Sequence, residues 1–305
     1  MSAKFTSFSF TAGTGLVRAA APLKATHPDL VISKQKLNQA KGISLVRLKR
    51  EEKQQSLCFA SRPFILCGLP VRALPPGELL YERRNGHFIL QVTGHPKFGV
   101  PYGQDRIVPI LLATLAIRQQ SPVVKFRSAA EMLDTFGMQK GGKQYHRLAA
   151  AFERIFGATI FFGTEESRAT SRLVRMARFN FLSEAQIWYD RTASETVTGP
   201  EGFENVIVLS DEFYREINAH RIPTDLEAVK VLVNAPAVLD LFMWVSYRCY
   251  TCKGEERIPL FGPGGLTAQL GSVEYSRERR FRAKFEQWLD GNSTCLACVP
   301  GTDRQ

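Results

Sequence analysis

This 305-residue sequence lacks the features of a membrane protein or of the common hydrolases. No apolar run approaches the roughly 20 residues that a membrane-spanning helix needs. No Gly-x-Ser-x-Gly or His-Glu-x-x-His motif is present, and the five histidines never form the close pair that a metal-dependent nicking enzyme combines with a tyrosine nucleophile. We therefore expect a soluble, cytoplasmic protein that is not an enzyme and needs no cofactor.

Acidic residues are scarce in the first third of the chain. Residues 1–100 hold 15 Lys or Arg and 5 Asp or Glu, whereas the remaining residues hold 25 and 24. The net charge of +11 therefore lies almost wholly in the first third. A basic, acid-poor segment is usually a solvated tail and sometimes a tether to nucleic acid. In the rest of the chain, only local clusters of cations can support DNA binding.

Cysteines are few, but four of the six form two C-x-x-C pairs, Cys249/Cys252 and Cys295/Cys298. Four thiolates can close a tetrahedral zinc site. The pairs are separated by about 42 residues, which is longer than the usual spacing in zinc ribbons. The first pair also ends a strongly apolar helix, where a thiol behaves as a small hydrophobic group. We therefore predict free thiols and no bound metal.

Residues 137–144 nearly match a phosphate-binding loop. The last position of that motif supplies a hydroxyl group to magnesium, and Gln144 has none. The segment also follows a predicted helix, whereas a P-loop follows a strand. Gly141 and Gly142 are better explained as the turn of a helix-turn-helix.

The periodicity of residues 101–192 predicts a winged-helix domain. The expected elements are a helix at 104–120, a strand at 123–126, a helix opened by a capping box at 128–131, a helix at 143–156, and β runs at 158–162 and 172–189. This order of helix, strand, helix, helix and hairpin is that of a helix-turn-helix with a β-hairpin attached.

A similar order occurs in residues 204–290, which we interpret as a second winged-helix domain. The expected elements are a strand at 206–209, a helix at 211–217, and a helix at 224–233 that is opened by a capping box at Thr224–Glu227. An apolar helix after Pro236, a strand at 257–261, a helix at 266–270 and a charged helix at 274–290 follow. A winged helix should close with a β-hairpin, yet residues 291–305 contain no strand pair and predict an irregular tail. We therefore expect this domain to be incomplete, with the aromatic face of its last helix partly in water.

The segments before the first domain show weaker patterns. Residues 1–62 lack sustained periodicity and predict a largely disordered arm, in which 33–55 is either a short exposed helix or not ordered. Residues 63–100 predict a linker with a short hairpin that turns at Asn85–Gly86. The predicted fold class is thus α+β, with two tandem winged-helix domains behind a basic, poorly ordered arm, the second domain lacking its C-terminal hairpin.

The helix expected at 143–156 has the pattern of a recognition helix. Its apolar stripe comprises Tyr145, Leu148, Phe152 and Ile155, and its opposite face carries Lys143, Arg147 and Arg154, with Lys140 just before the helix. Lysine and arginine meet phosphates, arginine also reaches guanine edges, and Gln144 is suited to adenine. An ordinary solvated face would show the same charges. The position of this helix, third in order and before a hairpin, favours DNA binding.

The helix expected at 274–290 repeats this arrangement less cleanly. Its packing face is Phe281, Phe285 and Trp288, and its cations are Arg277, Arg279, Arg280, Arg282 and Lys284. These cations spread around the helix, so we expect some of them to pair with Glu278 and Glu286. We predict that the others contact DNA phosphates.

A series of short segments also carries a family resemblance. The segments are Val100–Val108 with its helix through Arg118, Gly141–Lys143 with its helix through Phe156, Ile207–Phe213, Ile222–Leu226, Ala237–Trp244, Ile258–Pro259, Leu270–Ser272, and Phe281 with Phe285. Each is weak alone, but the series is specific. Together these segments, spanning Gly99 to about Leu289, resemble the RepA-type plasmid replication initiator proteins of bacteria.

That resemblance implies a definite function. It implies binding to repeated sites at a plasmid origin, local opening of the duplex, and recruitment of the host initiator and replicative helicase, by a monomer or a homodimer. Two other classes stay open. A winged-helix transcriptional regulator would bind DNA in the same way but would neither open the origin nor recruit replication proteins, and a structural or partner-binding protein would carry basic faces that are merely solvated.

Overall fold

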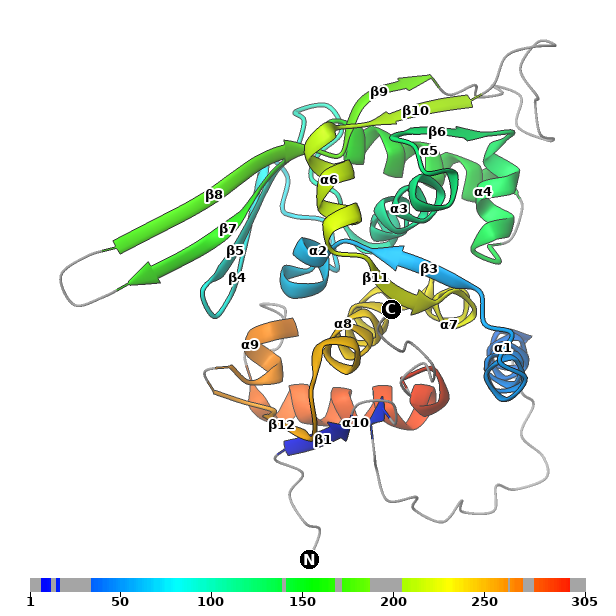
Figure 1. Ribbon diagram of the computed structural model, residues 1–305, viewed down its shortest axis with the longest axis vertical. Coiled ribbons are helices and arrows are strands. Elements are labelled where there is room, and N and C mark those ends of the chain that lie inside the picture. Colours follow the sequence, from blue (N-terminus) through cyan, green and yellow to red (C-terminus); the bar gives the residue numbers. More distant parts are fainter. Residues whose placement is uncertain are drawn as a thin grey trace, which may run out of the picture.

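The computed structural model describes residues 7–11, 15–16, 34–138, 141–167, 172–186, 205–262, 264–270 and 277–296 (Figure 1). Helices and strands are mixed through these residues, as the α+β prediction requires. Most of their buried apolar side chains belong to a single hydrophobic cluster. None of the helices in this part of the chain is long and apolar enough to cross a membrane.

The first half of the fold contains the elements predicted for residues 101–192. In chain order they are η1 (Gly103–Arg106), α3 (Ile107–Gln119), β6 (Val123–Phe126), α4 (Ala129–Thr135), α5 (Gly142–Phe156), β7 (Thr159–Ser167), β8 (Arg172–Asn180) and β9 (Leu182–Gln186). Helix α3 is the central element, because nine of its 13 residues are buried. Of the elements just named, η1, β6 and α5 pack against it.

The hairpin predicted for the linker is part of a four-stranded sheet. Strands β4 (Leu80–Asn85) and β5 (Phe88–Thr93) pair with Asn85 opposite Phe88, which confirms the hairpin but places its turn at Gly86–His87, one residue later than predicted. Strand β5 also pairs with β7, so the antiparallel order is β4-β5-β7-β8. The sheet projects from the body of the molecule (Figure 1). Residues 80–93 are therefore joined to the first half by hydrogen bonds.

Strand β10 (Asn205–Leu209) differs from its predicted role. The sequence predicts that it opens the second domain, but it pairs with β6 and β9 in the order β6-β10-β9. The reason is its alternation, because Ile207 and Leu209 are buried on one face, and an open strand edge lies beside them in the first half. The predicted boundary at 192–204 therefore falls between two paired strands.

The second half is built around helix α8. Its elements are α6 (Asp211–Ala219), β11 (Ile222–Asp225), α7 (Leu226–Leu232), α8 (Pro236–Thr251), β12 (Glu256–Pro259), α9 (Leu266–Leu270) and α10 (Glu278–Leu296). Trp244 of α8 is fully buried, and its Nε1 donates to Gln269 of α9 at 2.9 Å. This hydrogen bond satisfies the one polar atom of a large core side chain.

Helix α7 begins one residue later than its predicted capping box. The cap is Asp225, whose Oδ1 accepts from the backbone N–H groups of Glu227 and Ala228. The sequence predicts Thr224 in this role. Thr224 is instead buried in β11, and its hydroxyl donates to the carbonyl oxygen of Cys58. Because β11 pairs with β3, Thr224 is a strand residue and is not part of α7.

Part of the predicted arm is ordered. It contains α1 (Lys34–Glu51), β3 (Leu57–Ala60) and the start of α2 (Arg62–Cys67). Strand β3 pairs with β11, and Arg50 of α1 forms an ion pair of 2.8 Å with Asp225. Val46 is fully buried. The expectation of a largely disordered arm therefore does not hold for residues 34–62, because α1 packs on α7 and its cations meet buried carboxylates.

The arm also supplies strands to the second half. Strand β1 (Ser7–Thr11) pairs with β12 and with β2 (Gly15–Leu16), so the sheet order is β12-β1-β2. Helix α10 packs against α1, α8 and β2. Phe285 is fully buried and Trp288 is 8% exposed. The predicted exposure of this aromatic face is therefore wrong, because segments from the start of the chain cover it.

The cysteines differ from one another. Cys249 is in a disulfide bond, whereas Cys58, Cys67, Cys252 and Cys295 are free. The prediction of free thiols is therefore wrong for Cys249, since spacing along the chain does not show which sulfur atoms meet in the fold. Among the residues that the structure describes, no group of three or more His, Cys, Asp or Glu side chains is arranged to hold a metal ion.

Candidate nucleic-acid interface

The buried face of helix α5 matches the predicted stripe. Leu148, Phe152 and Ile155 are buried in the common core, and Tyr145 is partly buried against it. Ala151 extends this face toward η1. The helix is thus fixed to the first half by side chains from four successive turns.

The opposite face of α5 carries cations in solvent. Lys143 and Arg147 are exposed, and Gln144 is half-buried at the first turn. Neither cation forms an ion pair or hydrogen bond with another side chain in the described part of the chain. Lys140, which the sequence places just before the helix, lies outside the described residues. The start of α5 therefore presents one amide and two cations for an external ligand.

The turn before α5 follows from local sequence. Helix α4 is capped by Ser128, whose hydroxyl accepts from the N–H of Glu131 at 3.3 Å. The chain then leaves the helix at Gly137, which has a φ of 60°. This conformation is strained for a residue that has a side chain, and glycine adopts it freely. Helix α5 begins at Gly142 and packs against α4. The two helices that the sequence predicts on either side of Gly141 and Gly142 are thus α4 and α5, and they contact each other.

Arg154 is separated from the other cations of α5. Its Nε and Nη2 atoms donate to the carboxylate of Asp105 at 2.6 and 2.9 Å, and its guanidinium lies over the ring of Tyr102. The hydrogen bonds to Asp105 raise the pKa of Arg154. Only 17% of its side chain is exposed. Arg154 therefore anchors α5 to η1 and is not available for the phosphate contact that the sequence predicts.

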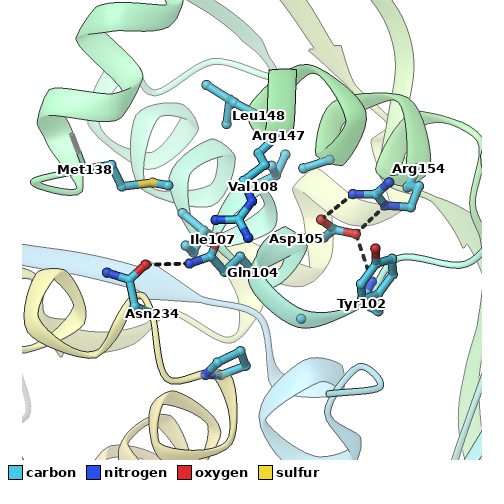
Figure 2. Close-up of a pocket in the computed structure, with 13 residues that line it drawn as sticks. Tyr102, Gln104, Asp105, Ile107, Val108, Met138, Arg147, Leu148, Arg154 and Asn234 are labelled. Atoms are coloured by element: carbon cyan, nitrogen blue, oxygen red, sulfur yellow. Dashed lines mark hydrogen bonds and ion pairs between the residues drawn. The ribbon is translucent and has the colours of Figure 1, made fainter. Parts of the chain in front are cut away.

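Arg147 lies at a cavity between the two halves (Figure 2). The cavity has a volume of about 310 Å³. Its walls come from η1, α3 and α5 on one side and from Asn234 and Pro236, at the start of α8, on the other. The side chain of Arg147 extends from α5 toward Gln104 of η1 (Figure 2). Gln104 in turn donates to Oδ1 of Asn234 at 2.7 Å.

The ribbon of β7 and β8 adds cations that the sequence patterns missed. Arg175 and Arg178 are exposed on β8, which is an edge strand of its sheet. They are three residues apart, so they lie on opposite faces of the strand and form no stripe. The one available signal was the density of arginines in a predicted β run directly after the helix-turn-helix. In the order of elements, this ribbon has the place of a wing.

Helix α10 presents a second group of cations. Arg277, Arg279, Arg280 and Lys284 are exposed, and Lys284 donates to Gln287 at 3.1 Å. None of these cations forms an ion pair with Glu278, and none pairs with Glu286, so the expected pairing is wrong among the described residues. Arg282 is half-buried with its guanidinium over the ring of Phe261, 5.3 Å from the centroid, and is less accessible than the others.

The buried thiols have no nucleophilic environment. Burial raises the pKa of Cys58 and of Cys67 to about 12, and that of Cys295 to about 11. A thiol with such a pKa stays protonated at neutral pH and is a poor nucleophile and a poor metal ligand. In contrast to these thiols, the cations of α5, β8 and α10 face solvent.

Comparison with known families identifies the chain. The profile of the family described as Replication initiator protein A matches residues 74–227, which is just over half of the sequence. The chain belongs to this family. The matched range runs from the linker before β4 through the whole first half to the start of α7. The resemblance to RepA-type plasmid replication initiators is thus confirmed, and the protein is assigned a role in the initiation of DNA replication.

Two solved structures are similar to this replication initiator. One is a crystal structure of selenomethionine derivatives of domain 2 and domain 3 of RctB, with 13% identity, a TM-score of 0.44, and coverage of 72% of this chain and 79% of that chain. The other is a crystal structure of RctB domains 2-3, with 14% identity, a TM-score of 0.45, and coverage of 72% and 80%. No curated protein sequence matches the chain.

Proposed function

We propose that this replication initiator binds repeated duplex sites at a plasmid origin through two winged-helix units and then recruits the host initiator and replicative helicase. In the first unit, α4 and α5 form the helix-turn-helix, and β7 and β8 form the wing. In the second, α10 is the DNA-contacting helix. The observation that carries the proposal is a pair of exposed cations at the start of α5, which pair with none of the residues that the structure describes, on a helix whose other face is buried.

The position of Lys143 and Gln144 suits them to different tasks. The N-terminal end of a recognition helix enters the major groove, where a glutamine side chain can form two hydrogen bonds with adenine. A lysine with a free ammonium group contacts phosphates. Arg147, one turn further, lies between the groove-facing side and the cavity. Because Asp105 and Tyr102 hold Arg154, α5 is presented at a fixed orientation, which favours base recognition over loose electrostatic association.

Helix α10 and the wing supply contacts that do not depend on sequence. Its exposed cations are Arg277, Arg279, Arg280 and Lys284, with Arg282 partly covered. Arg175 and Arg178 add charge along the ribbon. Contacts of this kind fix the position of a protein on the duplex and dominate the salt dependence of its affinity. We therefore assign phosphate contact to α10 and to the wing.

The test is duplex binding measured against salt by fluorescence anisotropy, with DNA from the region flanking the gene and with random DNA of equal length. Log affinity should fall linearly with log salt, with a slope of roughly 0.9 per phosphate contacted. Replacing Arg277, Arg279 and Arg280 together by Gln should reduce that slope by two to three units, as expected from the loss of three contacts. Arg215→Gln, an exposed arginine of α6, is the control. An affinity that does not change with salt would exclude the proposal.

Origin function needs a second assay, because a transcriptional regulator would also bind DNA. The protein should make thymines near the repeats reactive to permanganate in a supercoiled plasmid, and it should retain the host initiator and helicase on that DNA. Tight, specific binding with no strand opening and no retention would show that the chain acts as a regulator of transcription.

A further inference from the structure

The cavity between the two halves has the size and chemistry of a small ligand site. Its volume of about 310 Å³ is at the lower end of the range for ligand pockets. Its walls include the apolar side chains of Ile107, Val108, Met138 and Leu148. A mixed lining of apolar walls and a few polar groups is typical of sites that hold an organic molecule.

The polar groups in the cavity determine the ligand class. Arg147 has no ion pair or hydrogen bond with another described residue, so its guanidinium is open to an oxyanion. The Nε2 atom of Gln104 donates to Asn234, which leaves Oε1 of Gln104 as an acceptor and Nδ2 of Asn234 as a donor. Arg154 is also in the wall, but Asp105 already neutralises it. The cavity therefore offers one cation, one donor and one acceptor beside an apolar surface.

We propose that this cavity binds a phosphate ester of about the size of a mononucleotide, with the phosphate on Arg147 and the organic part between the two halves. A planar guanidinium matches the oxygens of a phosphate with two parallel hydrogen bonds. The donor and acceptor of Asn234 and Gln104 suit a polar ring or a sugar hydroxyl, which inorganic phosphate lacks. The ester has two sources with the same chemistry, a free mononucleotide or a nucleotide of a DNA strand.

The site would couple the two halves, because its walls belong to both. A ligand that contacts Arg147 and Asn234 together binds only while α5 and the start of α8 keep their relative position. The ligand also occupies the guanidinium of Arg147, which lies next to the proposed DNA-contacting end of α5. This consequence for DNA rests on the proposed function, whereas the binding of the ester does not.

The variants separate the cavity from the DNA interface. Asn234→Ala alters the cavity without touching α5, and Lys143→Gln alters α5 without touching the cavity. Both side chains are exposed, as is that of Arg147, so thermal unfolding of each unliganded variant should match that of the wild type. If the DNA proposal fails, Lys143→Gln leaves DNA affinity unchanged. If the cavity proposal fails, Asn234→Ala leaves ester affinity unchanged.

The probes are AMP, adenosine, inorganic phosphate and a single-stranded oligonucleotide, titrated calorimetrically into the full chain. AMP should bind more tightly than adenosine or phosphate, Arg147→Gln should weaken it by roughly tenfold to a hundredfold, and Asn234→Ala by several-fold. Lys143→Gln should bind AMP like the wild type. If only the oligonucleotide binds, and Asn234→Ala weakens it, the ester comes from DNA. The proposal is overturned if neither AMP nor the oligonucleotide binds. It is also overturned if Arg147→Gln and Asn234→Ala bind them as tightly as the wild type.

Discussion

Asp105 and Arg106 are consecutive residues of η1, and their side chains form ion pairs with different halves of the molecule. Asp105 accepts from Arg154 of α5 at 2.6 Å, and Arg106 forms an ion pair with Asp240 of α8, in which its Nη2 atom donates to Oδ2 at 3.0 Å. Asp105 and Arg106 are themselves almost fully buried. One turn of 3₁₀ helix thereby joins the proposed recognition helix to the core of the second half. The two halves therefore cannot change their relative orientation without moving this turn or breaking one of the two ion pairs.

We predict that Asp105→Asn destabilises the protein by about 3–5 kcal/mol, because it leaves the charge of Arg154 buried without a partner. The free energy of unfolding, measured with urea, tests this. Glu212→Gln is the matched control, since it breaks an exposed pair with Arg215 and should cost less than about 1 kcal/mol. A similar small loss for Asp105→Asn would show that the pair with Arg154 does not hold α5.

We predict different effects for Gln144→Ala and Lys143→Gln on DNA binding. Loss of a base contact by Gln144 should cost about 1–3 kcal/mol on the specific site and leave random DNA unaffected. Loss of a phosphate contact by Lys143 should weaken all sequences alike and lower the salt slope by about one. Competition binding with specific and random duplexes distinguishes the two. Undiminished discrimination in both variants would contradict the assignment of α5 as the recognition helix.

The burial of α10 leads to a prediction on stability. Phe285 is fully buried and stacks on Phe281, with ring centroids 6.1 Å apart. Phe285→Ala should therefore cost about 3–5 kcal/mol in the free energy of unfolding. Hydrogen exchange should protect residues 279–289 as strongly as 145–156, because both helices are anchored in one hydrophobic cluster. Rapid exchange confined to α10 would mean that its covering segments do not hold it.

The pairing of β1 with β12 predicts a role for the start of the chain. Removing residues 1–16 should leave β12 as an unpaired strand, because β1 is its partner at Ser7–Pro259 and Phe8–Ile258. The amides of 256–258 should then lose protection from hydrogen exchange, while those of β6 and β10 keep theirs. Unchanged protection at 256–258 in the shortened chain would show that β1 contributes nothing to this sheet.

Asp240 predicts a particular dependence of stability on pH. Burial raises the pKa of Asp240 from 3.8 to about 6, although Arg106 acts in the opposite direction. Between about pH 4 and 6 the folded protein therefore binds a proton that the unfolded chain has released, so the contribution of Asp240 to the free energy of unfolding falls as pH rises. The stability of the wild type relative to Asp240→Asn should be higher at pH 4 than at pH 7, by on the order of 2 kcal/mol. A difference that is constant over this range would rule out the raised pKa.

The local elements of the first half followed from the sequence. The stripe of Leu148, Phe152 and Ile155 predicted α5, and the glycines before it predicted the turn. Asn85–Gly86 predicted a hairpin, and Gly86 has the positive φ that its turn needs. Such features depend on residues within a few positions of each other. The family resemblance could also be found from the sequence, because it consists of short segments in a fixed order.

Pairings between distant segments did not follow from the sequence. The pattern of β10 gave its buried face but not its neighbours, and it pairs with β6 and β9. The partner of Arg154 was equally hidden, because Asp105 is 49 residues away and only the packing of α5 on η1 brings the two together. Whether a charged side chain on a helix is neutralised therefore depends on which residues the tertiary structure places beside it.

By itself, the sequence determined most helices and strands after residue 100, the amphipathic character of α5 and α10, and the similarity of the protein to replication initiators. These properties depend on local backbone preference and on periodicity. Only the tertiary structure decided that residues from the start of the chain cover α10, that Arg154 is an anchor, and that Arg147 lines a cavity between the halves. Those outcomes depend on which surfaces the fold buries together, and the free energy of that burial is shared among residues far apart in the chain.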